Sequence, residues 1–159
     1  MSTYLAMVIL VAGAIVLAIT YRIVKVLCQG GILRTSEQLS RPLQDLIERG
    51  RGDGYVILRL EGSNRFIQFN KYTNQGGDGI ELSFPNADWS REYFGKLQSV
   101  CNAEGIPYRV STGSDGMSFV DIDCGIDIDF ALGLVNTINA RVFCTPTSPR
   151  YVVSLRNAT

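Results

Sequence analysis

The stretch YVILRLEGSNRFIQFNK, residues 55–71, decides the fold of this chain. Both of its halves alternate apolar and polar side chains with a period of two, which is typical of half-buried β-strands. The residues GSN at 62–64 leave room only for a hairpin, so the two strands are predicted to be antiparallel. Residues 80–84 alternate in the same way before Pro85, which predicts a third strand of the same meander.

Amphipathic helices are expected before and after a second hairpin. Apolar residues keep to one stripe over 88–105 and again over 127–143. Strands at 108–111 and 117–124 lie between these helices, and a helix ending near Gly50 precedes the meander. The expected fold class is therefore α+β, with an N-terminal transmembrane helix and a two-layer domain. That domain has an antiparallel sheet and the element order α-β-β-β-α-β-β-α.

The transmembrane helix is predicted from the start of the chain, where no residue from Met1 to Tyr21 is charged. Spanning ~30 Å of hydrocarbon takes about 20 residues, which a helix over 4–26 supplies if Arg22 and Lys25 reach the headgroups. A cleaved secretory signal would need basic residues before the apolar run. A buried core helix would need a polar face.

Positive charge lies only on the C-terminal flank of this run, which places the N-terminus outside and the following domain in the cytoplasm. The chain is thus predicted to be a single-pass protein of the inner (plasma) membrane, in contact with the lipid bilayer. Ala14 and Ala18 have the spacing of helix-pairing residues, which leaves a homodimer open. Three parts are expected: an anchor at 1–28, a juxtamembrane connector and helix at 29–52, and a soluble α+β domain at 53–159. At 151–155 a short strand or a docked tail is expected.

Composition excludes several classes of function. The chain has no histidine, which rules out Ser-His and Cys-His nucleophiles. Its four cysteines have no close pairing, so neither a zinc knuckle nor a redox Cys-x-x-Cys motif is present. Fifteen basic residues balance fifteen acidic ones overall, but from Gly52 on there are nine basic and twelve acidic residues. A mildly acidic domain gives no electrostatic footprint for nucleic acid. We therefore expect no catalysis and no cofactor.

Four carboxylates at 121–129 form the one acidic cluster with a chemical interpretation. Asp121, Asp123, Asp127 and Asp129 could coordinate Mg²⁺ or Ca²⁺, which take oxygen ligands. Their spacing differs from that of the calcium-binding loop. The alternative is that the first two lie on one face of a strand end while the last two cap a helix and oppose its dipole.

Aromatic residues supply a candidate surface for a protein partner. Trp89 and Tyr93 lie on one stripe of a predicted helix, and Phe66 and Phe69 lie in a predicted strand. Together they could contact a partner. The alternative is that they pack in the core, as aromatic stripes at helical spacing commonly do.

Three segments carry a resemblance to a known family: FIQF at 66–69, IELSFP at 80–85 leading into an aromatic helix, and the closing apolar helix at 130–143. Between Ser36 and about Phe143 the succession of elements resembles the type III secretion chaperone-like fold. Bacterial sensory-regulator and chaperone-like domains share that fold. The resemblance implies binding of a partner polypeptide, often by a homodimer, without catalysis or cofactor. A membrane anchor departs from the family, because the secretion chaperones are soluble.

Three functions are compatible with these patterns. The leading hypothesis is a membrane-anchored, cytoplasm-facing module that binds a protein partner in the manner of chaperone-like or immunity-type domains. The second is a small structural or regulatory subunit of a membrane complex. The third is a metal-dependent enzyme that uses the carboxylates from Asp121 to Asp129.

Overall fold

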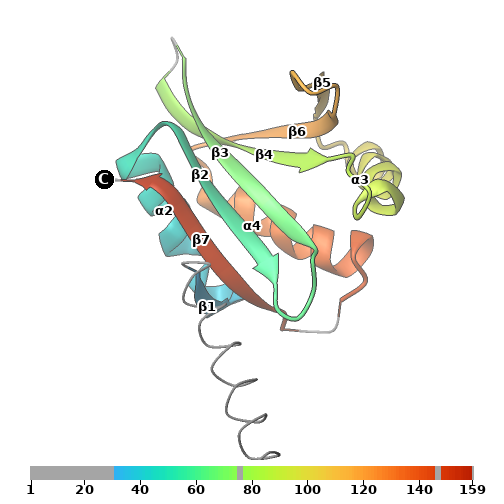
Figure 1. Cartoon of the computed structure of the whole chain (residues 1–159), viewed down its shortest axis with the longest axis horizontal. Coiled ribbons are helices and arrows are strands. Elements are labelled where there is room, and N and C mark those ends of the chain that lie inside the picture. Colours follow the sequence, from blue (N-terminus) through green and yellow to red (C-terminus); the bar gives the residue numbers. More distant parts are fainter. Residues whose placement is uncertain (1–30, 75–76, 146–147, 159) are drawn as a thin grey trace, which may run out of the picture. The chain divides into compact units, whose positions relative to one another are not determined.

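Seven strands pair into one antiparallel sheet in the computed structural model, which describes residues 31–74, 77–145 and 148–158. Their order across the sheet is β1-β7-β2-β3-β4-β6-β5 (Figure 1). The strands are β1 (Ile32–Thr35), β2 (Gly50–Leu60), β3 (Phe66–Asn74), β4 (Gly77–Pro85), β5 (Arg109–Thr112), β6 (Ser118–Gly125) and β7 (Arg150–Ala158).

Three α-helices accompany the sheet in the described residues: α2 (Ser40–Arg49), α3 (Arg91–Glu104) and α4 (Ile128–Thr137). A short 3₁₀ turn at Ser36–Gln38 leads toward α2, and α4 continues into a π-helical turn at Ile138–Val142. α2 packs on β2 and β7, while α4 contacts α2 and β6. Figure 1 shows α2 and α4 behind the strands, so that both lie on the same face of the sheet.

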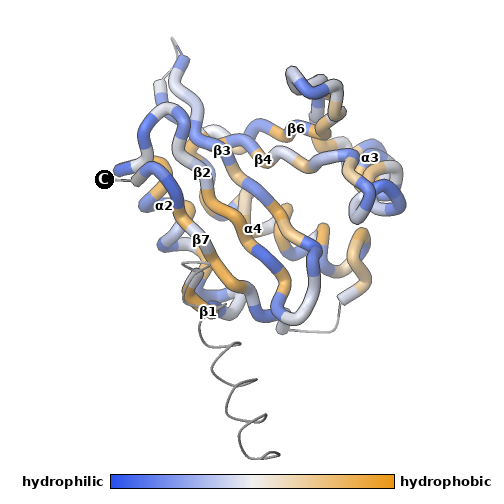
Figure 2. Tube along the Cα trace, viewed as in Figure 1, coloured by the Kyte–Doolittle hydropathy of each residue, from blue (hydrophilic) through white to orange (hydrophobic). Residues whose placement is uncertain are grey.

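The core lies between this face and the helices, because alternate residues of the central strands point toward the helices. Along β2, β3, β4 and β6 the same alternation places buried apolar residues on the helix side of the sheet and mostly polar residues on the other side. Figure 2 shows the strands as hydrophobic stretches interrupted by polar residues. The inward residues of these four strands are Val56, Leu58, Leu60, Ile67, Phe69, Ile80, Leu82, Phe84, Val120, Ile122 and Cys124.

Helix α2 belongs to the folded unit that runs from Ile32 to Thr159, although the sequence placed it in a juxtamembrane connector. Leu43 and Leu46 are fully buried against the sheet. Pro42 occupies the first turn of α2, where proline is tolerated because its missing N–H would have no intrahelical partner.

The predicted fold class is wrong about the extent of the sheet. The order α-β-β-β-α-β-β-α has no strand before its first helix and none after its last, whereas β1 and β7 occupy these places. β7 pairs with β1 on one side and with β2 on the other. Tyr151 and Val153 on β7 are buried in the core, so this strand completes the fold as an integral part of the sheet.

The predicted transmembrane helix at 4–26 falls in residues 1–30, outside the described residues. In the part of the chain that the structure describes, no helix is long and apolar enough to cross a membrane. The longest of these helices, α3, has 14 residues. At 1.5 Å per residue such a helix reaches about 21 Å, short of the ~30 Å of a hydrocarbon core. This finding contradicts the prediction of a single-pass, inner-membrane protein with a cytoplasmic domain.

Candidate functional site

One face of the sheet carries no helix from the described part of the chain. Residues that alternate with the core residues point out from this face, which we call the open face. The strand register sets five of them in one row from β7 to β6. The row consists of Arg156, Tyr55, Asn70, Glu81 and Asp123. It begins with a basic residue and ends with two acidic ones.

A hollow of about 590 Å³ lies on the open face at the acidic end of this row. Its walls come from β3, β4, β6 and the start of β5 with the residues just before it. Glu81, Asp121 and Asp123 line the hollow together with Arg109, Tyr72 and Tyr108. The hollow thus combines three carboxylates, one guanidinium and two phenol rings.

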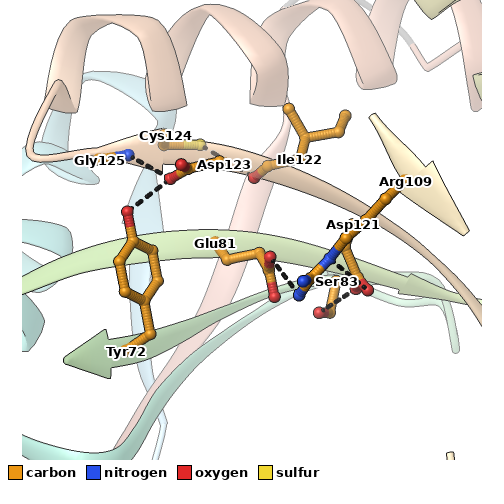
Figure 3. A network of polar contacts seen from close by, with 9 residues as sticks. All are labelled: Tyr72, Glu81, Ser83, Arg109, Asp121, Ile122, Asp123, Cys124 and Gly125. Atoms are coloured by element: carbon orange, nitrogen blue, oxygen red, sulfur yellow. Dashed lines mark hydrogen bonds and ion pairs between the residues drawn. The ribbon is translucent and has the colours of Figure 1, made fainter. Parts of the chain in front are cut away.

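Asp121 is the most buried of these carboxylates, with 4% of the residue exposed. Its Oδ1 accepts a hydrogen bond from the Ser83 hydroxyl at 2.6 Å, and its Oδ2 lies 3.5 Å from Nε of Arg109. The same guanidinium donates from Nη2 to Oε2 of Glu81 at 2.7 Å (Figure 3). Arg109 therefore bridges carboxylates on two neighbouring strands, which replaces part of the hydration that burial removes.

Glu81 stands in an environment that disfavours its charge. Burial raises the pKa of Glu81 above the ordinary value of a glutamate, and the negative charge of Asp121 raises it further. Arg109 acts in the opposite direction but does not cancel these effects. The raised pKa means that a further positive charge in the hollow would be favourable.

Asp123 closes the other side of the hollow and is exposed. Its Oδ1 accepts hydrogen bonds from the Tyr72 hydroxyl at 2.6 Å and from the Gly125 N–H at 2.9 Å. The bond to Asp123 raises the pKa of Tyr72 to about 12, because loss of the phenolic proton would break the bond and leave two adjacent negative charges. No described residue donates to Oδ2 of Asp123, so this oxygen can accept a hydrogen bond from a ligand.

The chemistry of the hollow suits a cationic group. Three carboxylates face a single guanidinium, and a lysine or arginine side chain would reduce this imbalance. Tyr72 and Tyr108 add ring faces that attract a cation at close range. An anionic ligand would meet repulsion from the same carboxylates.

The four acidic residues of the sequence-predicted metal site do not form one cluster. Asp121 and Asp123 lie on the open face, whereas the Asp127 carboxylate accepts a hydrogen bond from the Phe130 N–H at 2.8 Å and caps α4. Asp129 is exposed in the first turn of α4. Among the described residues no group of three or more His, Cys, Asp or Glu could hold a metal ion. The metal-dependent alternative therefore has no ligand set in this part of the chain.

The four aromatic residues predicted to contact a partner are distributed between the core and its rim. Phe69 is fully buried on the helix side of β3. Phe66 and Trp89 are half-buried, and their rings lie 4.6 Å apart between centroids. Tyr93 packs edge-on against Phe143, 5.1 Å away. The rings of Phe66, Trp89 and Tyr93 therefore contact other aromatic residues at the end of the sheet away from the hollow.

Sequence reasoning missed Tyr72, Glu81 and Arg109 as site residues. Each comes from a different strand, and only the register of β3, β4, β6 and β5 brings them together. One signal for Glu81 is present in the sequence, because this acidic residue alternates with the apolar residues Ile80 and Leu82. It had to lie on the face opposite the core.

No protein-family model matches this chain, and neither a curated protein nor a solved structure shows a significant match to it.

Proposed function

We propose that this chain is a non-catalytic protein-binding module whose hollow on the open face receives a basic side chain of its partner. The observation that carries the proposal is the excess of carboxylates over cations in a hollow that is accessible from the open face. A basic side chain would lie beside Glu81 and Asp123 and could donate a hydrogen bond to Oδ2 of Asp123.

The bonds within the hollow favour binding over acid–base catalysis. Arg109 ties Glu81 to Asp121, and the Tyr72 hydroxyl is committed to Asp123. Carboxylates tied in this way keep fixed positions as hydrogen-bond acceptors at neutral pH, whereas a general acid or base has to exchange its proton with a substrate. The resemblance of residues 66–69 and 80–85 to chaperone-like domains implies the same kind of ligand, a polypeptide.

Removal of a carboxylate from the hollow is expected to weaken the binding of a basic peptide. The probe is a short unstructured peptide with one central lysine, compared by calorimetry with the same peptide carrying norleucine. Asp123→Asn is expected to raise the dissociation constant of the lysine peptide about tenfold, because one charged hydrogen bond contributes about 1.5–3 kcal/mol before competing terms.

Asp129→Asn is the matched control, since it makes the same chemical change at an exposed position of α4 outside the hollow. It is expected to leave the dissociation constant within about twofold, as surface charge changes contribute little. At concentrations where the chain is monomeric, equal binding of the lysine and norleucine peptides, or equal effects of the two variants, would contradict the proposal.

As the pH falls, binding of the lysine peptide is expected to weaken at a higher pH than it would if Glu81 had the pKa of an ordinary glutamate. The folded pKa of Glu81 is raised, so its charge is lost as the pH falls through a value above the usual glutamate pKa of 4.5. The attraction for lysine decreases with that charge. Calorimetry between pH 8 and pH 4 measures the effect, and Glu81→Gln should remove the upper inflection while Asp129→Asn keeps it.

A further inference from the structure

The open face has a charge pattern that is complementary to itself. Among β7, β2, β3, β4 and β6, β3 is the middle strand. Arg156 at one end of the row and Asp123 at the other are therefore the same number of strands away from Asn70 on β3. At about 4.8 Å between strands, each end lies roughly 10 Å from the middle.

Apolar side chains occupy the part of the open face next to the basic end. Tyr55 and Ile57 on β2 point away from the core, as does Val152 on β7. Ile57 lies between Gln68 on β3 and Ser154 on β7. A partner that covers this strip would bury apolar area, and its acidic residues would have to face Arg156.

This chain itself presents the required combination. We propose that the partner is a second copy of the chain, packed face to face. The two copies are related by a two-fold axis that lies between the two sheets, above β3 and parallel to it. Such an axis exchanges β7 with β6 and β2 with β4, so that Arg156 of each copy enters the hollow of the other beside Asp123. Tyr55 of each copy then faces Glu81 of the other. The contact is isologous, and each hollow is completed by a residue from the opposite copy.

The surroundings of both charged residues agree with this arrangement. Arg156 is exposed, and it forms no ion pair with any described residue. Asp123 is also exposed and keeps Oδ2 available, as Figure 3 shows for the oxygen that is not joined by a dashed line. Two twisted sheets can pack face to face in this way with their strands about 30° apart.

The test is a charge exchange between two variants of the full chain. Asp123→Arg and Arg156→Asp should each shift the monomer–dimer equilibrium toward monomer by about tenfold or more, because each sets two pairs of like charges against one another. A mixture of the two variants should recover dimers that contain one copy of each. In that heterodimer one contact is native and the other has its charges exchanged.

Sedimentation measures each equilibrium, and energy transfer between differently labelled variants detects the mixed dimer. The neutralising variants Asp123→Asn and Arg156→Gln should also weaken the dimer, each by less than the charge reversal at the same position. This graded effect separates a lost contact from a lost fold. A mixture that forms no more dimer than the separate variants, or variants that dimerise like the parent, would overturn the inference.

This inference rests on the proposed function but fails separately from it. A parent chain that stays monomeric and still binds the lysine peptide would overturn the second-copy partner and keep the hollow as a site for another protein. A monomeric chain that does not bind the lysine peptide would overturn both the second-copy partner and the proposed function of the hollow.

Discussion

Replacement of Phe69 by alanine is expected to lower the free energy of unfolding by about 3–5 kcal/mol. Phe69 is fully buried on β3, where it lies opposite Val56 on β2 and Leu82 on β4. Removal of the ring would leave a cavity in the middle of the sheet that these neighbours cannot fill. Urea denaturation of the parent and the variant, followed by circular dichroism, measures the loss.

Phe66→Ala is the matched control, because it makes the same change three residues earlier on the opposite face of β3. Phe66 is half-buried, and its ring packs against Trp89 in a tilted arrangement. Its replacement should cost about 1–2 kcal/mol, from one aromatic pair and a smaller buried area. If Phe69→Ala left the stability unchanged, the core position of this residue would be refuted and its sequence-based role as a partner contact would regain support.

Replacement of Lys71 by methionine is expected to lower the free energy of unfolding by about 2 kcal/mol. Lys71 lies on the helix side of β3, and 8% of the residue is exposed. Its Nζ donates to the Ile47 carbonyl at 2.5 Å and lies 2.8 Å from Oδ2 of Asp78. The Ile47 carbonyl belongs to the last turn of α2, where carbonyls have no intrahelical partner and carry the negative end of the helix dipole.

Methionine keeps the volume of the lysine stem but cannot donate to that carbonyl, so the loss reports the missing cap. Asp78→Asn is the control, and its effect should be smaller because Asp78 is exposed and its amide can still accept a hydrogen bond from Lys71. Hydrogen exchange should show faster opening of the end of α2 in Lys71→Met only. Equal stability of Lys71→Met and the parent would show that water satisfies the carbonyl.

The central meander could be predicted from the sequence because its alternation is local. The residues of 55–71 specify by themselves which side chains face the core, and β2 and β3 follow that pattern. The start of β2 could not be predicted, since residues 50–54 contain three glycines and no alternation. They join the strand through an irregular register with β7, in which Gly50 lies opposite Ala158.

For α3 too, the sequence predicted the helix but not the residue at which it begins. The aromatic stripe indicated a helix from Asp88, yet α3 begins at Arg91. Ser90 before it is fully buried, and its hydroxyl donates to the Pro85 carbonyl at 2.5 Å and accepts from the Ala87 N–H. These bonds hold residues 85–90 in a turn that periodicity alone does not reveal.

Part of the candidate site was visible in the sequence. Asp121 and Asp123 were predicted as site residues because they lie close together in the chain. Arg109 and Glu81 were not predicted, although they bind each other and Arg109 also contacts Asp121. Spacing along the chain identifies clusters only within one element, and a site that spreads over four strands needs their register.

The sequence by itself determined the alternating strands, the amphipathic helices and the absence of histidine chemistry. These properties depend on neighbouring residues or on composition, so they need no knowledge of the fold. Only the tertiary structure decided that β7 lies between β1 and β2 and that the face bearing Glu81 and Asp123 carries no described helix. The physical reason is that strands pair through backbone groups that all residues share, so the side-chain pattern shows which way a residue points but not which strand lies beside it.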